Sequence, residues 1–296
     1  MRVVFLGNHT VGVRALRAIN ESAEVSGVIA HPTDAEDGVR YESVFDLARG
    51  NAWNCIRGKG RDRQTLEFVA AAKPDLLWIT DFRYLIPREM VALAPCGAVN
   101  LHPSLLPAYR GRASINWAIL KGETKLGLSG HFVDEAADSG DLIEQVSYEV
   151  REDQDVGDCL NILYPLYTSM TNKILSYFQS GSVPRTPQDA SRATVYPARK
   201  PEDGVIDWGQ AARSILNLVR AVAAPYPGAF TSVNGRKLTV WKARIVTEAG
   251  SNSRPGEVIE ANDRETLVQC GAGVLALTSV EMPDQIHKID GCRLGT

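Results

Sequence analysis

The chain has 296 residues, of which 44% are hydrophobic and 23% charged, a composition typical of a soluble globular protein of about two domains. Its 32 basic and 35 acidic residues give a net charge of −3, which argues against a protein whose main task is to bind a polyanion. The five cysteines form no C-x-x-C pair, and no histidine lies at ligand spacing from them. We therefore expect neither a metal site nor a disulfide framework.

No stretch of the sequence resembles a targeting or membrane segment. The apolar residues 3–6 are too few for a secretory signal peptide, and no run approaches the roughly 18 apolar residues of a membrane-spanning helix. An odd number of cysteines suits a reducing compartment. These features predict a cytoplasmic protein that does not associate with a membrane.

The first part of the chain alternates between short apolar runs and stretches of helical periodicity. The runs are predicted to be strands and lie at residues 3–6, 25–30, 74–79, 97–102 and 124–132. Helices are predicted between them over residues 11–19, 65–72 and 114–120, and a long amphipathic helix over 160–179. This alternation is typical of a parallel sheet covered by helices, so residues 1–180 are predicted to form an α/β domain.

The second part of the chain has a different pattern. Residues 181–206 are rich in Ser, Pro, Arg and Thr without periodicity, and we interpret them as a linker. One helix is predicted over 211–223, followed by short strands at 229–233, 237–241, 256–259, 266–270 and 274–280. Residues 207–296 are therefore predicted to form a small β-barrel or sandwich domain.

The loop after the first predicted strand argues against the commonest ligand of a βαβ unit. Residues 7–12 read GNHTVG, which lacks the G-x-G-x-x-G fingerprint of dinucleotide binding, and no G-K-[ST] phosphate-binding loop occurs in the chain. We therefore do not expect NAD or a nucleoside triphosphate bound through these motifs.

The most informative segment follows the strand predicted at 97–102. Asn100 and His102 alternate along it, so their side chains point to the same face, close to the carboxyl end where open α/β sheets bind ligands. An amide donor beside an imidazole suits acyl transfer. A histidine at a strand end is, however, more often structural, so the pair alone leaves both interpretations open.

A carboxylate would orient the imidazole and raise its pKa. The candidate segment is residues 134–141, a glycine-punctuated loop that holds Asp134, Glu135, Asp138 and Asp141. Spacing alone does not select one of these four, and such a loop is ordinarily a solvated turn.

Together these segments resemble the 10-formyltetrahydrofolate-dependent formyltransferases. The resemblance is carried by Asn100-x-His102 followed by Pro-Ser-Leu-Leu-Pro, by Arg110-Gly111, and by Asp138-x-Gly140, which begins 38 residues after Asn100. Further matches lie at residues 121–124, 206–208 and 225–230. The resemblance covers essentially the whole chain and is weakest after Met282.

The resemblance implies a Rossmann-like catalytic domain followed by a small domain like an open OB barrel. It implies Asn100, His102 and Asp138 as catalytic residues. A substrate amine would attack the formyl carbon, Asn100 and His102 would stabilise the oxyanion, and His102 would receive the amine proton with Asp138 fixing its tautomer.

The same resemblance implies 10-formyltetrahydrofolate as cosubstrate, with no metal required. In that family the pteridine is held by backbone groups. The corresponding residues are Tyr84, Leu85 and Ile86, together with the loop 133–138 that contains Asp134.

Two acceptor classes fit a chain with this domain order: methionyl-tRNA and nucleotide-linked amino sugars. The C-terminal domain argues against glycinamide ribonucleotide formyltransferases, and the formyltetrahydrofolate hydrolases and dehydrogenases carry domains not found here. The tRNA enzymes have a basic loop after the second strand, whereas residues 31–40 hold three acidic residues and one basic residue. The region from Asp207 onward contains ten basic and nine acidic residues, so it is nearly neutral. Both features disfavour tRNA.

Residues 41–44, 105–113, 220–223 and 238–241 resemble the formyltransferase domain that acts on UDP-4-amino-4-deoxy-arabinose, although Ser114 stands where that enzyme has proline. A nucleotide-linked amino sugar is therefore the expected substrate. The alternatives are methionyl-tRNA and, less favoured, a non-catalytic folate- or nucleotide-binding regulator. A homodimer stays open because sugar formyltransferases commonly dimerise.

Two arginines are expected to contact the substrate. Arg110 and Arg112 are assigned to its diphosphate because guanidinium groups bind phosphate bidentately, the alternative being a surface ion pair. His131 falls where the arabinose enzyme also has a histidine. Because it lies on an apolar strand, we expect it to be structural.

Overall fold

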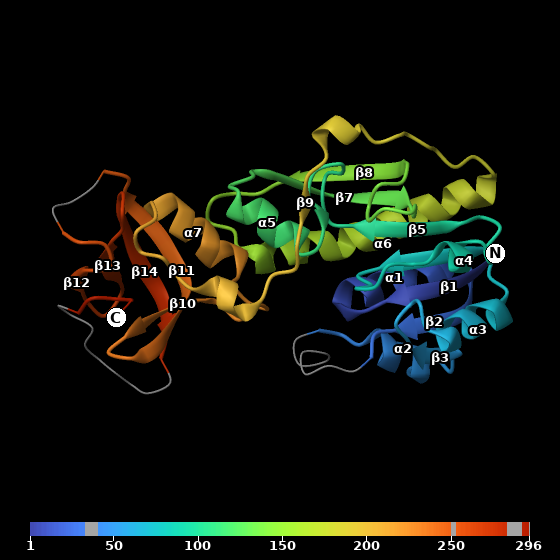
Figure 1. Cartoon of the computed structure of the whole chain (residues 1–296), viewed down its shortest axis with the longest axis horizontal. Coiled ribbons are helices and arrows are strands. Elements are labelled where there is room, and N and C mark those ends of the chain that lie inside the picture. The colour runs from blue at the N-terminus through green and yellow to red at the C-terminus, as the bar shows by residue number, and fades with distance from the viewer. Residues whose placement is uncertain (33–40, 250–252, 283–291, 296) are drawn as a thin grey trace. The chain divides into compact units, whose positions relative to one another are not determined.

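The structure, a computed structural model, describes residues 1–32, 41–249, 253–282 and 292–295 (Figure 1). The chain divides into two compact units. The first comprises Met1–Gly111, Leu126–Tyr148 and Asn161–Tyr196, and the second comprises Arg112–Lys125, Glu149–Leu160 and Pro197–Thr296. The segment interpreted as a linker therefore contributes residues to both units.

The first unit is built on a seven-stranded sheet with the order β3-β2-β1-β4-β5-β7-β8. Its strands are β1 (Arg2–Gly7), β2 (Glu24–Ala30), β3 (Cys55–Arg57), β4 (Leu76–Thr80), β5 (Ala98–His102), β7 (Lys125–Phe132) and β8 (Leu142–Glu149). The first five strands pair in parallel, and β7 joins β5 antiparallel. The prediction of a Rossmann-like α/β domain is confirmed, while β3 and β8 were not predicted.

Strand order reverses between β1 and β4. From β1 the chain proceeds outward through β2 to β3, and it then returns to β4 and continues through β5 on the other side. In open α/β sheets, ligands bind outside the carboxyl ends of the strands at such a switch point. The topology therefore places the ends of β1, β4 and β5 next to one another.

Five helices accompany this sheet: α1 (His9–Ser22), α2 (Val44–Gly50), α3 (Arg63–Ala72), α4 (Arg88–Val91) and α6 (Val156–Ser180). Helices α2, α3 and α6 begin at side-chain caps, since Ser43, Asp62 and Asp155 accept from the backbone N–H groups of Asp46, Thr65 and Asp158. The predicted helices at 11–19, 65–72 and 160–179 are confirmed, each starting two to four residues earlier than expected.

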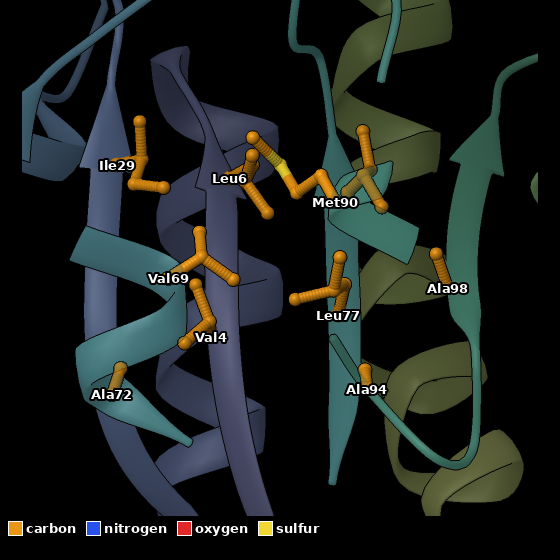
Figure 2. Close-up of a cluster of buried hydrophobic side chains, with 10 residues drawn as sticks. Val4, Leu6, Ile29, Val69, Ala72, Leu77, Met90, Ala94 and Ala98 are labelled. Atoms are coloured by element: carbon orange, nitrogen blue, oxygen red, sulfur yellow. The ribbon is translucent and has the colours of Figure 1, made fainter. Parts of the chain in front are cut away.

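One hydrophobic cluster of the first unit lies on one face of the central strands (Figure 2). Val4 and Leu6 of β1 and Leu77 of β4 point to the same face because side chains alternate along a strand. Val69 of α3 and Met90 of α4 pack onto them, and all five residues are fully buried. Figure 2 shows α3 lying across this face. Burial of such aliphatic side chains is the main term stabilising the sheet.

Truncation at the centre of this cluster is expected to destabilise the first unit. We predict that Leu77→Ala lowers its free energy of unfolding by about 3 kcal/mol, because the lost apolar contact adds to the cost of the cavity left behind. Urea denaturation followed by tryptophan fluorescence, with Trp78 buried in the same strand, measures the change. Leu93→Ala is the control, since Leu93 is 36% exposed and its truncation should cost much less. Equal losses in the two variants would contradict the prediction.

The second unit contains α5 (Ser114–Leu120), α7 (Ala212–Ala221) and a five-stranded sheet of order β10-β11-β14-β13-β12. The strands are β10 (Ala229–Val233), β11 (Arg236–Thr247), β12 (Val258–Ala261), β13 (Thr266–Gln269) and β14 (Val274–Glu281), and neighbours pair antiparallel. Asn234 and Gly235 both adopt positive φ between β10 and β11, which is the hairpin turn expected of Asn-Gly. The prediction of a C-terminal β domain is confirmed.

Arg220 organises the interior of the second unit. Its guanidinium group donates to the backbone oxygens of Arg151 and Gln154 and to the side chain of Asn217. Nearby, the amide of Asn116 donates to the oxygen of Ala221, which ties α5 to α7. In the part of the chain that the structure describes, no helix has both the length and the apolarity needed to cross a membrane.

Candidate active site

Asn100 and His102 lie on β5, as predicted. Hydrogen bonding aligns Asn100 with Ile79 of β4 on one side and with His131 of β7 on the other. His102 is the last residue of the strand and is only 5% exposed. Because β5 is held between two neighbours, both side chains project from a rigid part of the sheet.

Asp138 is the acidic residue that completes this pair. It lies in the loop after β7 and has a φ of +54°, a left-handed conformation that is uncommon for residues other than glycine. Its Oδ1 accepts a hydrogen bond from the Asn100 amide at 3.1 Å, and its Oδ2 accepts from the backbone N–H of Gly111 at 2.8 Å. Oδ2 also lies 3.6 Å from His102 Nδ1. The three residues predicted to be catalytic are thus brought together.

The hydrogen bonds of His102 define where it holds a proton. Its Nε2 lies 2.8 Å from the backbone oxygen of Tyr109, which can only accept, so Nε2 carries a hydrogen. In the neutral ring the lone pair is therefore on Nδ1, which faces Asp138. A proton gained at Nδ1 is stabilised directly by the carboxylate.

Burial and charge have opposite effects on the pKa values of His102 and Asp138. Burial lowers the pKa of His102 below its usual value, and the negative charge of Asp138 offsets this only in part. Burial by itself would raise the pKa of Asp138, but the positive charge that His102 carries when protonated, the nearby His131 ring and the hydrogen bond from the Gly111 N–H outweigh it, and its pKa falls well below the usual range. At neutral pH the site therefore holds an ionised Asp138 beside a neutral His102.

His131, which was interpreted from the sequence as structural, contacts two of the three predicted catalytic residues. Its Nε2 lies 3.1 Å from the Asn100 amide nitrogen and 3.5 Å from Asp138 Oδ1. Its Nδ1 lies 2.7 Å from the oxygen of Phe132, so Nδ1 donates and Nε2 accepts from Asn100. The signal was available in principle, because Asn100 and His131 are direct cross-strand neighbours once β5 and β7 are paired.

The residues assigned to folate binding fall in two segments that lie next to each other. Tyr84, Leu85 and Ile86 follow β4, and the side chain of Leu85 is 53% exposed. Asp134 begins the loop after β7 and is exposed. Arg88, two residues after Ile86, forms an ion pair of 3.4 Å with Glu135 of the second segment.

The two arginines assigned to a diphosphate differ in their surroundings. Arg110 is half-buried in the first unit, where its Nε and Nη2 donate to Gln188 Oε1 at 3.2 and 2.7 Å. Arg112 is exposed and belongs to the second unit. The structure therefore gives Arg110 a protein partner and does not test the contact of either residue with substrate.

A second polar group lies at the switch point and was not predicted. His9 follows β1 and Asp81 follows β4, and His9 Nδ1 lies 2.6 Å from Asp81 Oδ2. Both residues have positive φ, at +58° and +54°. Behind them the buried His31 accepts a hydrogen bond from the backbone of Arg83. Each of the three residues lies within three positions of the end of a predicted strand, and His9 alone was considered from the sequence, where a solvated turn residue was the favoured interpretation.

Residues 1–163 match the family described as formyl transferase, and residues 199–287 match the formyl transferase C-terminal domain. The chain belongs to the formyl transferase family. Its members transfer formyl groups, so the prediction of an enzyme of this class is confirmed, as is the resemblance on which it rested. The family assignment covers both units of the structure.

Solved structures of several formyltransferases share this fold. The sugar 3N-formyl transferase WlaRD, crystallised with dTDP and 5-N-formyl-THF, is 17% identical with a TM-score of 0.73, over 97% of this chain and 99% of that one. A methionyl-tRNA formyltransferase from Clostridium thermocellum is 17% identical with a TM-score of 0.60, over 96% and 100%.

A variant of HypX from Aquifex aeolicus is 22% identical with a TM-score of 0.66 and is matched over 96% of this chain. The chain spans 45% of the length of HypX. At these identities the likeness shows a common fold and does not select among the substrates of the three proteins.

Proposed function

We propose that this protein transfers the formyl group of 10-formyltetrahydrofolate to the amine of a nucleotide-linked amino sugar. The observation that carries the proposal is the buried contact of Asp138 with Asn100, His102 and the Gly111 amide in a chain of the formyl transferase family. Folate as formyl donor is supported by WlaRD, solved with 5-N-formyl-THF, and by HypX, solved with tetrahydrofolic acid.

The polar groups present fit this chemistry. When bound, the folate supplies the formyl group, and a C–N bond to the amine replaces the bond to the folate nitrogen. His102 is neutral because burial lowers its pKa, so it accepts the proton that the attacking amine loses, and that proton passes on to the folate nitrogen. Asp138 stabilises the imidazolium formed in between.

Asn100 supplies a hydrogen bond to the formyl oxygen as negative charge develops there. Its amide hydrogens engage Asp138 and His131 in this structure, and the bond to Asp138 is the stronger of the two because its acceptor is an ionised carboxylate. When the folate is bound, the Asn100 amide therefore replaces its hydrogen bond to His131 with one to the formyl oxygen. Its bond to Asp138 keeps the amide oriented. Donors of this type are commonly worth about 3 kcal/mol in the transition state.

The sugar-nucleotide acceptor is proposed on the character of one loop, within a fold that sugar-nucleotide enzymes and a methionyl-tRNA enzyme both have. WlaRD and a Helicobacter canadensis N-formyltransferase solved with dTDP-3-aminofucose share the fold over at least 93% of this chain. The loop at residues 31–40 carries three acidic residues where a tRNA-binding loop needs basic ones, and all but its first two residues lie outside the described residues. The methionyl-tRNA enzyme shares the fold as well, so tRNA is the competing acceptor.

A formyl-transfer assay tests the proposal. The protein is incubated with 10-formyltetrahydrofolate and either a panel of UDP- and dTDP-amino sugars or charged initiator methionyl-tRNA, and release of tetrahydrofolate is followed by absorbance. We expect turnover on an amino sugar that Asn100→Ala abolishes. Turnover on methionyl-tRNA alone would overturn the sugar assignment, and absence of transfer to either class would overturn the proposed reaction.

A further inference from the structure

The segment that joins the two sequence-predicted domains packs onto the active site. Thr186 pairs with Leu142 at the start of β8, through two backbone hydrogen bonds of 2.8 and 2.9 Å. Further along, Val195 and Tyr196 form the short strand β9 (Val195–Tyr196), which pairs in parallel with β6 (Arg110–Gly111). Residues 186–196, here named the strap, therefore contact the start of β8 and the loop after His102.

Gln188 is the strap residue that reaches the Asp138 loop. It is half-buried although Pro187 and Asp189 on either side are exposed, so its side chain points inward. Its Nε2 donates to the backbone oxygens of Asp138 at 2.9 Å and of Gly140 at 2.7 Å. Its Oε1 accepts two hydrogen bonds from the Arg110 guanidinium. One amide thus connects the loop that carries Asp138 to the loop that follows His102.

The strap also supports the group that fixes His102. Thr194 Oγ1 accepts from the N–H of Tyr109, and the oxygen of Thr194 accepts from the N–H of Arg110. The rings of Tyr109 and Tyr196 stack at 5.2 Å with an angle of 14°. Tyr109 is the residue whose backbone oxygen accepts from His102 Nε2. The partner groups of both His102 and Asp138 are therefore held by the same segment.

We propose that Gln188 is a positioning residue that holds the Asp138 carboxylate against His102 and Asn100. The inference deepens the proposed function and rests on it for the catalytic consequence. Asp138 has a left-handed backbone, which Asp adopts less readily than glycine, so contacts of the surrounding loop help to enforce it. The two hydrogen bonds from Gln188, to the residue itself and to Gly140 two positions later, supply that enforcement.

Two variants separate the roles of the side chain. Gln188→Leu removes both the donor and the acceptor. Gln188→Glu keeps an acceptor for Arg110 and loses only the N–H groups that bind the Asp138 loop. Gln179→Leu is the matched control, because Gln179 is exposed on α6 in the same unit and donates to the oxygen of Ser22 away from the site.

Amide hydrogen exchange at Gly111 reports the position of Asp138 directly, since this N–H donates to Asp138 Oδ2. We expect exchange at Gly111 to become at least about tenfold faster in both Gln188 variants, while the amide of Val133, which donates to the oxygen of Ala98, keeps its wild-type rate. In the transfer assay we expect kcat to fall by about 10²-fold with little change in KM. Gln179→Leu should change none of these values.

The outcomes distinguish the inference from the proposed function. Wild-type exchange at Gly111 in either Gln188 variant would overturn the positioning role, and so would equally faster exchange at Gly111 and Val133, which would indicate general destabilisation. A wild-type protein that transfers no formyl group, combined with Gly111 exchange that still depends on Gln188, would overturn the proposed function while leaving the positioning of Asp138 supported.

Discussion

Asp138→Asn is expected to lower kcat/KM for formyl transfer by about a thousand-fold, the scale on which loss of an orienting carboxylate acts in acid–base catalysis. Asparagine has nearly the same shape and tolerates the left-handed backbone of Asp138, so the loop should remain in place. What is lost is the negative charge that stabilises a proton on His102 Nδ1, together with one of the two oxygens that accept from Asn100 and Gly111. Steady-state kinetics with the amino-sugar acceptor measures the loss.

The same variant is expected to shift the pH dependence of kcat/KM. Asp138 raises the pKa of His102 against the lowering by burial, so removing the charge lowers that pKa further. In the pH profile, the range over which kcat/KM rises as His102 loses its proton therefore moves to lower pH. Asp141→Asn is the control, since Asp141 pairs with Arg185 at 3.7 Å on the outer side of the loop and should leave the profile unchanged. A shift to higher pH in Asp138→Asn would contradict this account of the pair.

Gly111→Ala is expected to impair both activity and folding. Gly111 has a φ of +95°, and a Cβ atom built there would lie 2.4 Å from the backbone oxygen of Tyr196. The backbone must shift to relieve this overlap, which separates β6 from β9 and moves the N–H that Asp138 accepts from. We expect a loss of about 3 kcal/mol in the free energy of unfolding and of about 10²-fold in kcat.

Gly181→Ala separates the cost of a side chain on a left-handed backbone from the cost of the overlap with Tyr196. Gly181 also has a positive φ, at +71°, but no atom lies within 4 Å of the position of an added Cβ. The Gly181→Ala variant should therefore lose only about 1 kcal/mol of its free energy of unfolding, from the strained backbone, and should keep full activity. Urea denaturation and the transfer assay, run on both variants, make the comparison. Equal effects at the two positions would show that contact between β6 and β9 does not matter.

Elements with a strong periodic pattern were predictable from the sequence. The apolar runs at 3–6 and 25–30 are buried strands, and the helix at 114–120 has the predicted bounds, because hydrophobic periodicity reports burial directly. Strand β8 was missed although it is eight residues long. Only Ile143 in it is buried, and its four apolar residues are divided by polar ones, so it has no continuous apolar run.

The candidate site was predicted in part. Asn100 and His102 share a strand, so their common face followed from a period of two. Asp138 was selected from the four acidic residues of its loop only through the family resemblance. Its contact with Asn100 and His102 depends on how the loop after β7 folds back, which the sequence pattern does not show. Gln188 and His131 gave no local signal, since each becomes significant only through a partner 31 to 78 residues away in the chain.

The strap has a consequence for how this protein is made. A fragment that ends at residue 180, the limit suggested by periodicity, contains the sheet and all three proposed catalytic side chains but lacks Gln188, Thr194 and Tyr196. During translation the sheet is therefore complete well before the strap leaves the ribosome. We expect the active site of a nascent chain to become ordered only once residue 196 has emerged. The sheet of the first unit therefore folds before the proposed catalytic residues are held in place.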